Sequence, residues 1–365
     1  MKKSLIALAV LAAAGTASAQ SSVTLFGIVD ATVQRISNSG GASVTHLTDS
    51  GYNSSRLGFR GTEDLGGGMS ASFWLEAGVN NDNGTGDATS TNNQAVGAFV
   101  PGTGANAPVR AGTQGLTFNR RSTVSLAGGW GELRLGRDYT PQFFNLTVFD
   151  PFGTNGVGTT QTLNSIITGS TAVRASNSIG YLLPAKLGGF YGQLQYYMGE
   201  NLDNVANEDD GTGVGARVGY AAGPFNVALS LSRTDNLGAD IQQNNIGGQW
   251  DFGMAKLMGH YSWDEVGAVE GKGWLIGGLV PVGAGEIRLA FSQYETDLGL
   301  GGADPKARKL ALGYVHNLSK RTALYATYAR VRNSNGSAAA VAAGAGAPAV
   351  NASSSGFDLG LRHSF

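Results

Sequence analysis

The 365-residue sequence contains no cysteine, only nine prolines and, after its first twenty residues, no long apolar stretch. The absence of cysteine excludes disulfides and thiol chemistry. A helix needs about 20 consecutive apolar residues to cross a bilayer, so the rest of the chain is expected to contain no transmembrane helix. Because proline is scarce, the 57 glycines do not indicate a collagen-like or disordered segment, and turns and closely packed strands remain as their use.

The charge is nearly balanced, with 25 basic and 26 acidic side chains and a net charge of −1. This balance gives no strongly basic field, so nucleic acid is not an expected partner. The four histidines are scattered without the short spacing of a metal site. No phosphate-binding loop and no Gly-x-Ser-x-Gly elbow is present. We therefore expect neither enzyme activity nor a cofactor.

The first residues have the three parts of a secretory signal peptide. Two lysines precede an apolar run over residues 5–14, and the Ala-Ser-Ala triplet 17–19 provides a cleavage site. We expect cleavage after Ala19, which leaves residues 20–365 as one mature domain exported through the periplasm. An N-terminal membrane anchor is the alternative, but the apolar run is too short to span a bilayer.

Apolar and polar residues alternate with a period of two through much of the remaining chain. Residues 357–365 show the pattern up to the final residue, with Phe357 and Leu359 on one face. The same alternation recurs in residues 225–232 and 286–292. A period of two predicts β-strands with one apolar and one polar face.

Short Gly-rich segments predict tight turns that join these strands in pairs, and longer polar segments separate the pairs. Seven turns join fourteen strands, and one strand at each end, near residues 23–33 and 357–365, gives sixteen. The sequence therefore predicts a closed, antiparallel, transmembrane β-barrel of 16 strands with short periplasmic turns and long extracellular loops. A soluble β-sandwich is the alternative, but it would leave strand edges open. The predicted turns are residues 63–68, 128–131, 185–189, 222–224, 251–254, 282–285 and 317–320, and the long loops are residues 80–115, 142–173, 201–210 and 335–356.

Alternation alone does not decide whether the polar face points to bulk water or into a lumen. Aromatic residues near the predicted strand ends, the leader and the asymmetry between turns and loops together favour a polar lumen. The last long loop, residues 335–356, contains an Ala-rich stretch that glycines and a proline interrupt. We predict a flexible surface loop there.

Several motifs resemble those of the general porins of Gram-negative bacteria, in particular the trimeric sixteen-stranded type of β-proteobacteria. The resemblance covers nearly the whole mature chain and includes a terminal Phe similar to the assembly signal of outer-membrane proteins. It implies a homotrimer in the outer membrane, in contact with lipid and lipopolysaccharide, that passes small hydrophilic solutes and ions by passive diffusion. The motifs are residues 23–30 (VTLFGIVD), 55–66 (SRLGFRGTEDLG), 131–138 (GELRLGRD), 317–322 (NLSKRT) and 360–365 (GLRHSF).

The resemblance also implies that the third extracellular loop, residues 142–173, folds into the lumen and narrows it. In that family, acidic groups on this loop face a basic cluster on the wall, and Asp150 is the candidate here. On the wall, Arg56 and Arg60 share one face of the predicted second strand, so alternation and resemblance both place them inward.

Three further arginines are candidates for the lumen. On the fourth strand the resemblance places Arg120 inward, whereas the apolar residues that follow place Arg121 inward by alternation; we favour Arg120. Arg134 has the inward parity of its strand, and Arg174 resembles the basic residue where the chain returns from the constriction loop to the wall. The alternative for each arginine is a solvated charge without effect on selectivity.

A sixteen-stranded barrel leaves an aqueous lumen that small solutes cross by diffusion. Rings of basic side chains favour anions in pores, so we expect a modest anion preference. An outer-membrane barrel that acts as an enzyme or adhesin is the main alternative, because a fold does not fix a function. It would need a catalytic constellation or an ordered loop face that the sequence does not indicate.

Overall fold

The protein is built almost entirely of antiparallel strands. The computed structural model describes residues 22–87, 89, 93, 99–100, 105–106, 115–169 and 173–365, so the predicted signal peptide lies outside the described residues. Most of the predicted loop over residues 80–115 also lies outside them. The strands are β1 (Ser22–Asn38), β2 (Ser43–Asp49), β3 (Arg56–Gly66), β4 (Met69–Asn80), β5 (Thr85–Gly86), β6 (Phe99–Val100), β7 (Ala105–Asn106), β8 (Arg121–Gly128), β9 (Gly131–Tyr139), β10 (Arg174–Leu182), β11 (Phe190–Tyr197), β12 (Gly213–Ala222), β13 (Phe225–Thr234), β14 (Ile241–Asp251), β15 (Lys256–Val266), β16 (Val269–Val282), β17 (Gly285–Asp297), β18 (Lys306–Asn317), β19 (Thr322–Ser334) and β20 (Ser353–Ser364).

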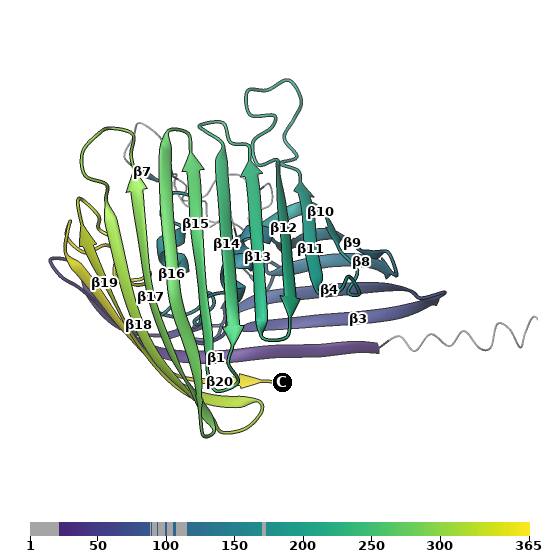
Figure 1. The fold of residues 1–365 in the computed structure, drawn as a ribbon, viewed down its shortest axis with the longest axis horizontal. Helices are drawn as coiled ribbons and strands as arrows, with labels where there is room; N and C mark the ends of the chain where they lie inside the picture. The colour runs from purple at the N-terminus through teal and green to yellow at the C-terminus, as the bar shows by residue number, and fades with distance from the viewer. Residues whose placement is uncertain are drawn as a thin grey trace, which may run out of the picture.

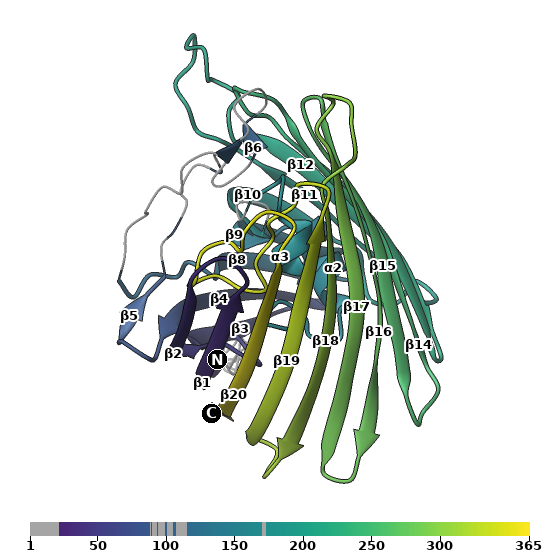
Figure 2. The same cartoon turned by 90° about the vertical axis from the view of Figure 1, so that its left-hand side faces the viewer.

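The strands form a closed barrel (Figures 1 and 2). Each strand from β8 to β20 pairs with its sequence neighbour, β4 pairs with β3 and β8, and β1 closes the ring by pairing with β20. On its other side β1 pairs with β3 over residues 22–28 and with β2 over residues 31–37, so β2 and β3 together fill one position in the wall. The barrel thus has the sixteen antiparallel strands that the sequence predicts.

Burial alternates along the strands and identifies the two faces of the wall. On β18 the side chains of Lys309 and Ala311 are 1% exposed, whereas those of Leu310 and Leu312 are 52% and 54% exposed. An apolar outer surface matches lipid, and a polar inner face matches a lumen. The barrel therefore has the polar interior that the sequence predicts.

The seven predicted turns all join neighbouring strands at one end of the barrel. The turn between β3 and β4 contains Gly66, Gly67 and Gly68 with φ values of 78°, 63° and 77°, a region that residues with a Cβ rarely adopt. Most connections at the opposite end are longer, although β1–β2, β13–β14 and β15–β16 are joined by short segments.

The third long loop enters the barrel and carries two helices, α2 (Pro141–Val148) and α3 (Gln161–Asn164), which Figure 2 shows enclosed by the strands. Pro141 occupies the first turn of α2, where a missing N–H costs nothing. Asn145 on this helix donates to the carbonyl of Ala228 at 3.0 Å and to Asn245 at 2.7 Å, which fixes α2 against the wall. Within the described residues, no helix is long and apolar enough to cross a membrane.

The loop between β19 and β20 differs from its prediction. Its Val341 is fully buried and Ala345 is 8% exposed, and both pack in the same core cluster as Val157 of the third loop. Gly344 and Gly346 have φ values of 106° and 70°, which lets the loop turn back into the barrel. The expectation of a flexible surface loop over residues 335–356 was wrong for its Ala-rich part, because Val341 and Ala345 are buried with Val157 of the third loop, whereas Val350 is 63% exposed.

Candidate functional site

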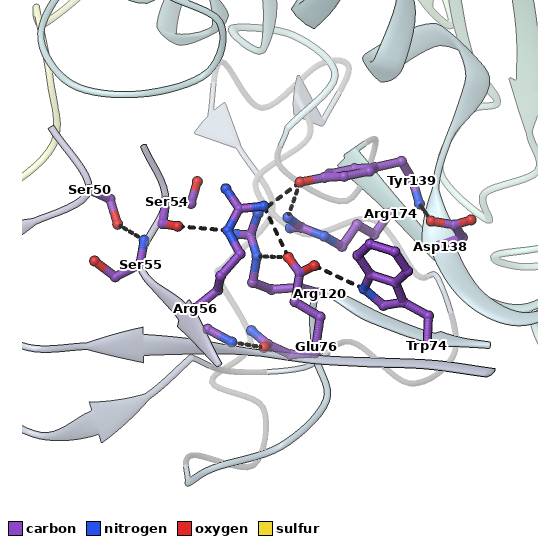
Figure 3. A network of polar contacts seen from close by, with 12 residues as sticks. Ser50, Ser54, Ser55, Arg56, Trp74, Glu76, Arg120, Asp138, Tyr139 and Arg174 are labelled. Atoms are coloured by element: carbon purple, nitrogen blue, oxygen red, sulfur yellow. Dashed lines mark hydrogen bonds and ion pairs between the residues drawn. The ribbon is translucent and has the colours of Figure 1, made fainter. Parts of the chain in front are cut away.

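Three arginines from separate segments meet on one side of the lumen (Figure 3). Arg120 donates to the hydroxyl of Tyr139 at 2.8 Å, and Arg174 donates to the same oxygen at 3.0 Å. The guanidinium of Arg174 also lies 4.6 Å from the centre of the Tyr139 ring, a cation–π distance. Arg56 approaches from β3, and Glu76 completes what we call the Tyr139 cluster.

Glu76 is the acid of the Tyr139 cluster. It accepts from Arg120 at 2.7 Å and from Arg56 at 3.3 Å, and its second oxygen accepts from the indole of Trp74 at 3.0 Å. Glu76 and Arg120 are 5% and 6% exposed, respectively. One carboxylate therefore faces three guanidinium groups, counting Arg174, so the cluster has an excess of positive charge.

Arg120 and Arg121 both point toward the lumen. Arg121 is paired with Glu76 in the register between β8 and β4, so the two side chains share a face. Its guanidinium lies 4.7 Å from the Trp74 ring and 3.8 Å from a carboxylate oxygen of Asp138. Arg120 precedes the first residue of β8 and is not bound by the alternation of that strand. The two residues are therefore neighbours in the site, not alternatives.

Arg134 lies lower on the same wall and is neutralised by acids of its own strand. It binds Asp138 at 2.6 Å and Glu132 at 2.8 Å. Its partner in the register is Ser125 of β8, which faces inward and is 6% exposed. Arg134 thus lines the lumen while adding little net charge to it.

Arg60 is exposed and lies on the same face of the sheet as Trp74, its partner in the register between β3 and β4. Its guanidinium lies 5.0 Å from the Trp74 ring and 5.2 Å from the Phe26 ring. Arg60 makes no ion pair within the described part of the chain. Its charge is therefore directed to the water of the lumen.

The structure places Asp150 differently from the other candidates. Its carboxylate accepts from the backbone N–H groups of Phe152 and Thr160 at 2.8 and 2.9 Å and is 6% exposed. Burial raises the pKa of Asp150 to about 6. Asp150 therefore organises the third loop from inside and does not join the Tyr139 cluster.

Further lumen arginines were not singled out from the sequence. Arg288 stacks on Tyr52 at 4.5 Å and donates to its hydroxyl at 3.1 Å, and Arg362 lies 5.5 Å from the same ring. Arg217 donates to Asn145 of α2 at 2.7 Å. Alternation assigns each arginine to the inner face of its strand, but no local pattern indicates the loop residues that it contacts.

A cavity of about 360 Å³ opens beside the Tyr139 cluster. Wall residues including Arg56, Arg121 and Arg134 line one side, and Phe144 of α2 lines the other. The third loop and the wall thus bound a cavity that has charged side chains on its wall side. No group of His, Cys, Asp or Glu side chains in the described residues is placed to hold a metal ion.

Comparisons with known proteins agree with this architecture. A family model for Gram-negative porins matches residues 5–336. Outer membrane porin protein 32 of Delftia acidovorans is 38% identical in an alignment that covers all of both chains. The solved structure of an anion-selective porin from Comamonas acidovorans is 35% identical, with a TM-score of 0.77 over 94% of this chain and 100% of its own. The trimer form of OmpT from Vibrio cholerae shares the fold, with a TM-score of 0.65 at 13% identity over 94% of this chain and 99% of its own.

The family match extends over most of the sequence, and the full-length relative is similar from end to end. Both agree with a barrel that is apolar outside, polar inside and narrowed by an inserted loop. The chain therefore belongs to the Gram-negative porins, which are channels of the outer membrane and not enzymes.

Proposed function

We propose that this porin is a passive channel that prefers anions, because the narrow part of its lumen has a basic wall and no exposed acid on the loop that faces it. The third loop contains a single acidic residue, Asp150, and that carboxylate is buried in the loop. The wall opposite contributes the Tyr139 cluster and Arg60, and this contrast is the observation that carries the proposal.

The excess of positive charge acts on ions through water at short range. Charges within about 8 Å of an ion are only partly screened at physiological salt, and low-dielectric walls strengthen their field. A small anion that passes between α2 and the wall is stabilised there, whereas a cation is repelled. Solutes still move down their gradients, since nothing in the mechanism needs an energy source.

The relative named as an anion-selective porin supports the same assignment, because it is similar over nearly the whole chain. Only the preference for anions is inferred from this relative. The physiological solute depends on contacts that a charge balance does not specify.

Reversal potentials across planar bilayers under a salt gradient test the proposal. We expect an anion-selective sign for the wild-type channel and a clear shift toward zero for the variant Arg56→Gln/Arg60→Gln/Arg174→Gln. Arg233→Gln is the matched control, because Arg233 lies on the outer face and is already paired with Asp240 at 2.6 Å. A cation-selective wild type, or equal potentials in the triple variant and the wild type, would refute the anion preference.

We also propose that the protein assembles as a homotrimer in contact with outer-membrane lipid and lipopolysaccharide, after removal of residues 1–19. The trimer form of OmpT and the exposed apolar band of the barrel support this assembly. The mass of the unheated complex and N-terminal sequencing of the outer-membrane form test these two points. A one-chain mass, or a first residue other than Gln20, would contradict the respective point.

A further inference from the structure

Phe144 is exposed on a loop that buries its other large apolar side chains. Phe143, Phe149 and Leu163 of the third loop are 7%, 0% and 0% exposed, whereas Phe144 is 39% exposed. Phe144 lies on α2, inside the barrel, and lines the cavity beside the Tyr139 cluster (Figure 2). The guanidinium of Arg217 lies 4.9 Å from the ring and covers only part of it. Because contact between water and apolar surface is unfavourable, the exposed part of the ring is a surface on which a solute can pack.

Two further rings line the same cavity of about 360 Å³. Trp74 lies on β4 and Tyr139 ends β9, so both rings come from the wall (Figure 3). Cavities of about 300–1,000 Å³ hold small molecules, and they combine apolar and aromatic surface with a few polar groups that orient the ligand. This cavity therefore has the size and the lining of a site for a small molecule that carries a ring.

Arg121 supplies the cavity with a cation that has free donors. Its Nε donates to the hydroxyl of Thr123 at 3.0 Å and lies 3.8 Å from a carboxylate oxygen of Asp138. Among the residues that the structure describes, its two terminal nitrogens have no hydrogen-bond partner. The guanidinium lies 4.7 Å from the Trp74 ring, a cation–π distance that holds it in place. A guanidinium held in this way can bind both oxygens of a carboxylate through two parallel hydrogen bonds.

The other charged groups of the cavity already have partners. Asp138 accepts from Arg134 at 2.6 Å. Glu76 accepts from Arg56 at 3.3 Å. Arg56 and Arg134 therefore already hold carboxylates of the protein, and Arg121 is the cation with donors to spare. One such guanidinium matches one carboxylate, so the cavity fits a monoanion better than a dianion.

We propose that the cavity is a binding site for aromatic monocarboxylates as they pass through the channel, with the carboxylate on Arg121 and the ring on Phe144. The inference rests on the proposed anion preference and adds a class of solute to it. An aromatic carboxylate contacts both the guanidinium and the exposed ring, whereas a small inorganic anion uses only the guanidinium. Binding is weak, because a solute that is conducted must also leave its site.

Inhibition of the chloride current through single channels in planar bilayers tests the proposal. The probes are benzoate, acetate without the ring, benzamide without the charge, and cyclohexanecarboxylate, whose ring has no π face. We expect benzoate to reach half-inhibition at a concentration about two- to tenfold lower than acetate or cyclohexanecarboxylate, the contribution of one aromatic contact. Benzamide is expected to leave the current unchanged over the same range. Equal potency of benzoate and any of the other three probes would overturn the proposal.

Two variants assign the ends of the ligand to their partners. Phe144→Ala is expected to raise the half-inhibiting concentration of benzoate about two- to tenfold and to leave that of acetate within about twofold. Arg121→Gln is expected to raise both concentrations about two- to fivefold, the range for a partly exposed ion pair. Unchanged inhibition by benzoate in either variant would overturn the proposal.

Matched controls are Phe190→Ala and Arg233→Gln. Phe190 is 55% exposed on the outer face of β11, and Arg233 lies on the outer face of β13. Both variants are expected to respond to benzoate as the wild type does. A loss of benzoate inhibition in these controls equal to that in the site variants would show that the effect does not come from the cavity.

Reversal potentials under a KCl gradient separate this inference from the proposed anion preference. Phe144→Ala removes no charge and is expected to keep the reversal potential of the wild type. An anion-selective wild type on which benzoate and acetate are equally potent would refute the aromatic site alone. A wild type without anion preference that benzoate still inhibits selectively would refute the anion preference and keep the site.

Two measurements cover the case in which Phe144→Ala does not fold. The comparison among the four probes uses the wild type only. Phe144→Leu keeps an apolar side chain on α2 and removes the aromatic face, so it is expected to lose the advantage of benzoate over cyclohexanecarboxylate. A retained advantage in Phe144→Leu would overturn the role of the Phe144 ring.

Discussion

Replacement of Lys309 by methionine is expected to release the two loops that fill the barrel. The ammonium group donates to the carbonyl of Thr159 at 2.6 Å, to the hydroxyl of Thr162 at 3.1 Å and to the carbonyl of Val341 at 3.1 Å. It thereby ties the third loop and the β19–β20 loop to the same point on β18. Methionine keeps the length of the side chain but donates no hydrogen bond.

The size of the effect follows from the burial of this site. Lys309 is 1% exposed, so water does not replace the lost donor, and the carbonyls of Thr159 and Val341 are left without it. A buried acceptor without a partner costs about 1–3 kcal/mol. Removing one partner from a buried ionic network costs about 3–5 kcal/mol. The carboxylates of Asp150 and Asp358 interact with the same ammonium and lose its charge. We therefore expect the folded arrangement of the two loops to be destabilised by about 3 kcal/mol, the lower end of the range for a buried ionic network.

Hydrogen exchange at single amides measures this loss. The N–H groups of Val157 and Thr160 donate to the carboxylates of Asp358 and Asp150, so they report directly on the seated loop. A loss of about 3 kcal/mol lowers their protection by roughly a hundredfold. Protection in the strands is expected to stay the same, because the ladder is intact. Single-channel records should show more frequent brief closures from a mobile loop.

Lys272→Met is the control for this experiment. Lys272 is a lysine near the loop end of β16 with an exposed ion pair to Glu270, and exposed pairs contribute about 0–1 kcal/mol. Unchanged protection of the Thr160 amide in Lys309→Met, or an equal loss in Lys272→Met, would refute the argument that the buried ammonium anchors the loops.

Three further predictions concern the lumen. Glu76→Gln removes the acid of the Tyr139 cluster and is expected to raise the anion-to-cation permeability ratio by up to about fifteenfold at low salt. A unit charge about 5 Å away in water contributes ~0.8 kcal/mol, which is about fourfold for each ion and opposite in sign for anion and cation. A lower ratio from reversal potentials would contradict it. Gly247→Ala is expected to displace the third loop and alter single-channel conductance, because a Cβ there would lie 2.2 Å from the Phe149 ring, whereas Gly248→Ala meets its nearest atom at 3.4 Å and should leave conductance unchanged. The pKa of Asp150 is raised from 3.8 to about 6, so its protonation favours the buried loop: the contribution is fully present below pH 3.8 and is lost as pH rises through 6. Hydrogen exchange of the loop should show this change, and Asp150→Asn should abolish it; a loop that instead becomes more protected over that range would show the sign to be wrong.

The strands and turns could be predicted because their signals are local. Alternation of side chains and the glycines of a hairpin lie within a few residues of each other, as at Gly66 to Gly68. The same alternation places Arg56 and Arg60 on one face of the strand. In the structure both lie on the face of the sheet that carries Glu76 and Trp74. The residue at which a strand begins is less evident from the sequence. The choice between Arg120 and Arg121 as the inward-facing side chain depended on the start of β8.

The arrangement of the loops could not be predicted, since it depends on contacts between distant segments. Tyr52 lies between β2 and β3, and only the closed barrel brings Arg288 and Arg362 to its ring. Likewise, the burial of Val341 depends on Val157, which is far away in sequence. The resemblance suggests that Asp150 on the third loop faces the basic wall. The backbone N–H groups that enclose its carboxylate become visible only once the loop is folded.

Closure of the wall by β1 and β20 also restricts the order in which the protein can fold. Gln34 and Asp358 are hydrogen-bonded across this pair although they are 324 residues apart, whereas most other neighbouring strands are joined by a short turn or loop. For a flexible chain, closing such a loop costs about 3 kcal/mol more than closing one of ten residues. If the local hairpins form first, they shorten the length of free chain between β1 and β20. Pairing of β1 with β20 is therefore expected to be the last step of folding. Until then the sheet has two unpaired edges that can pair with other chains. The nascent barrel therefore remains open to pairing with other chains until this last pair forms.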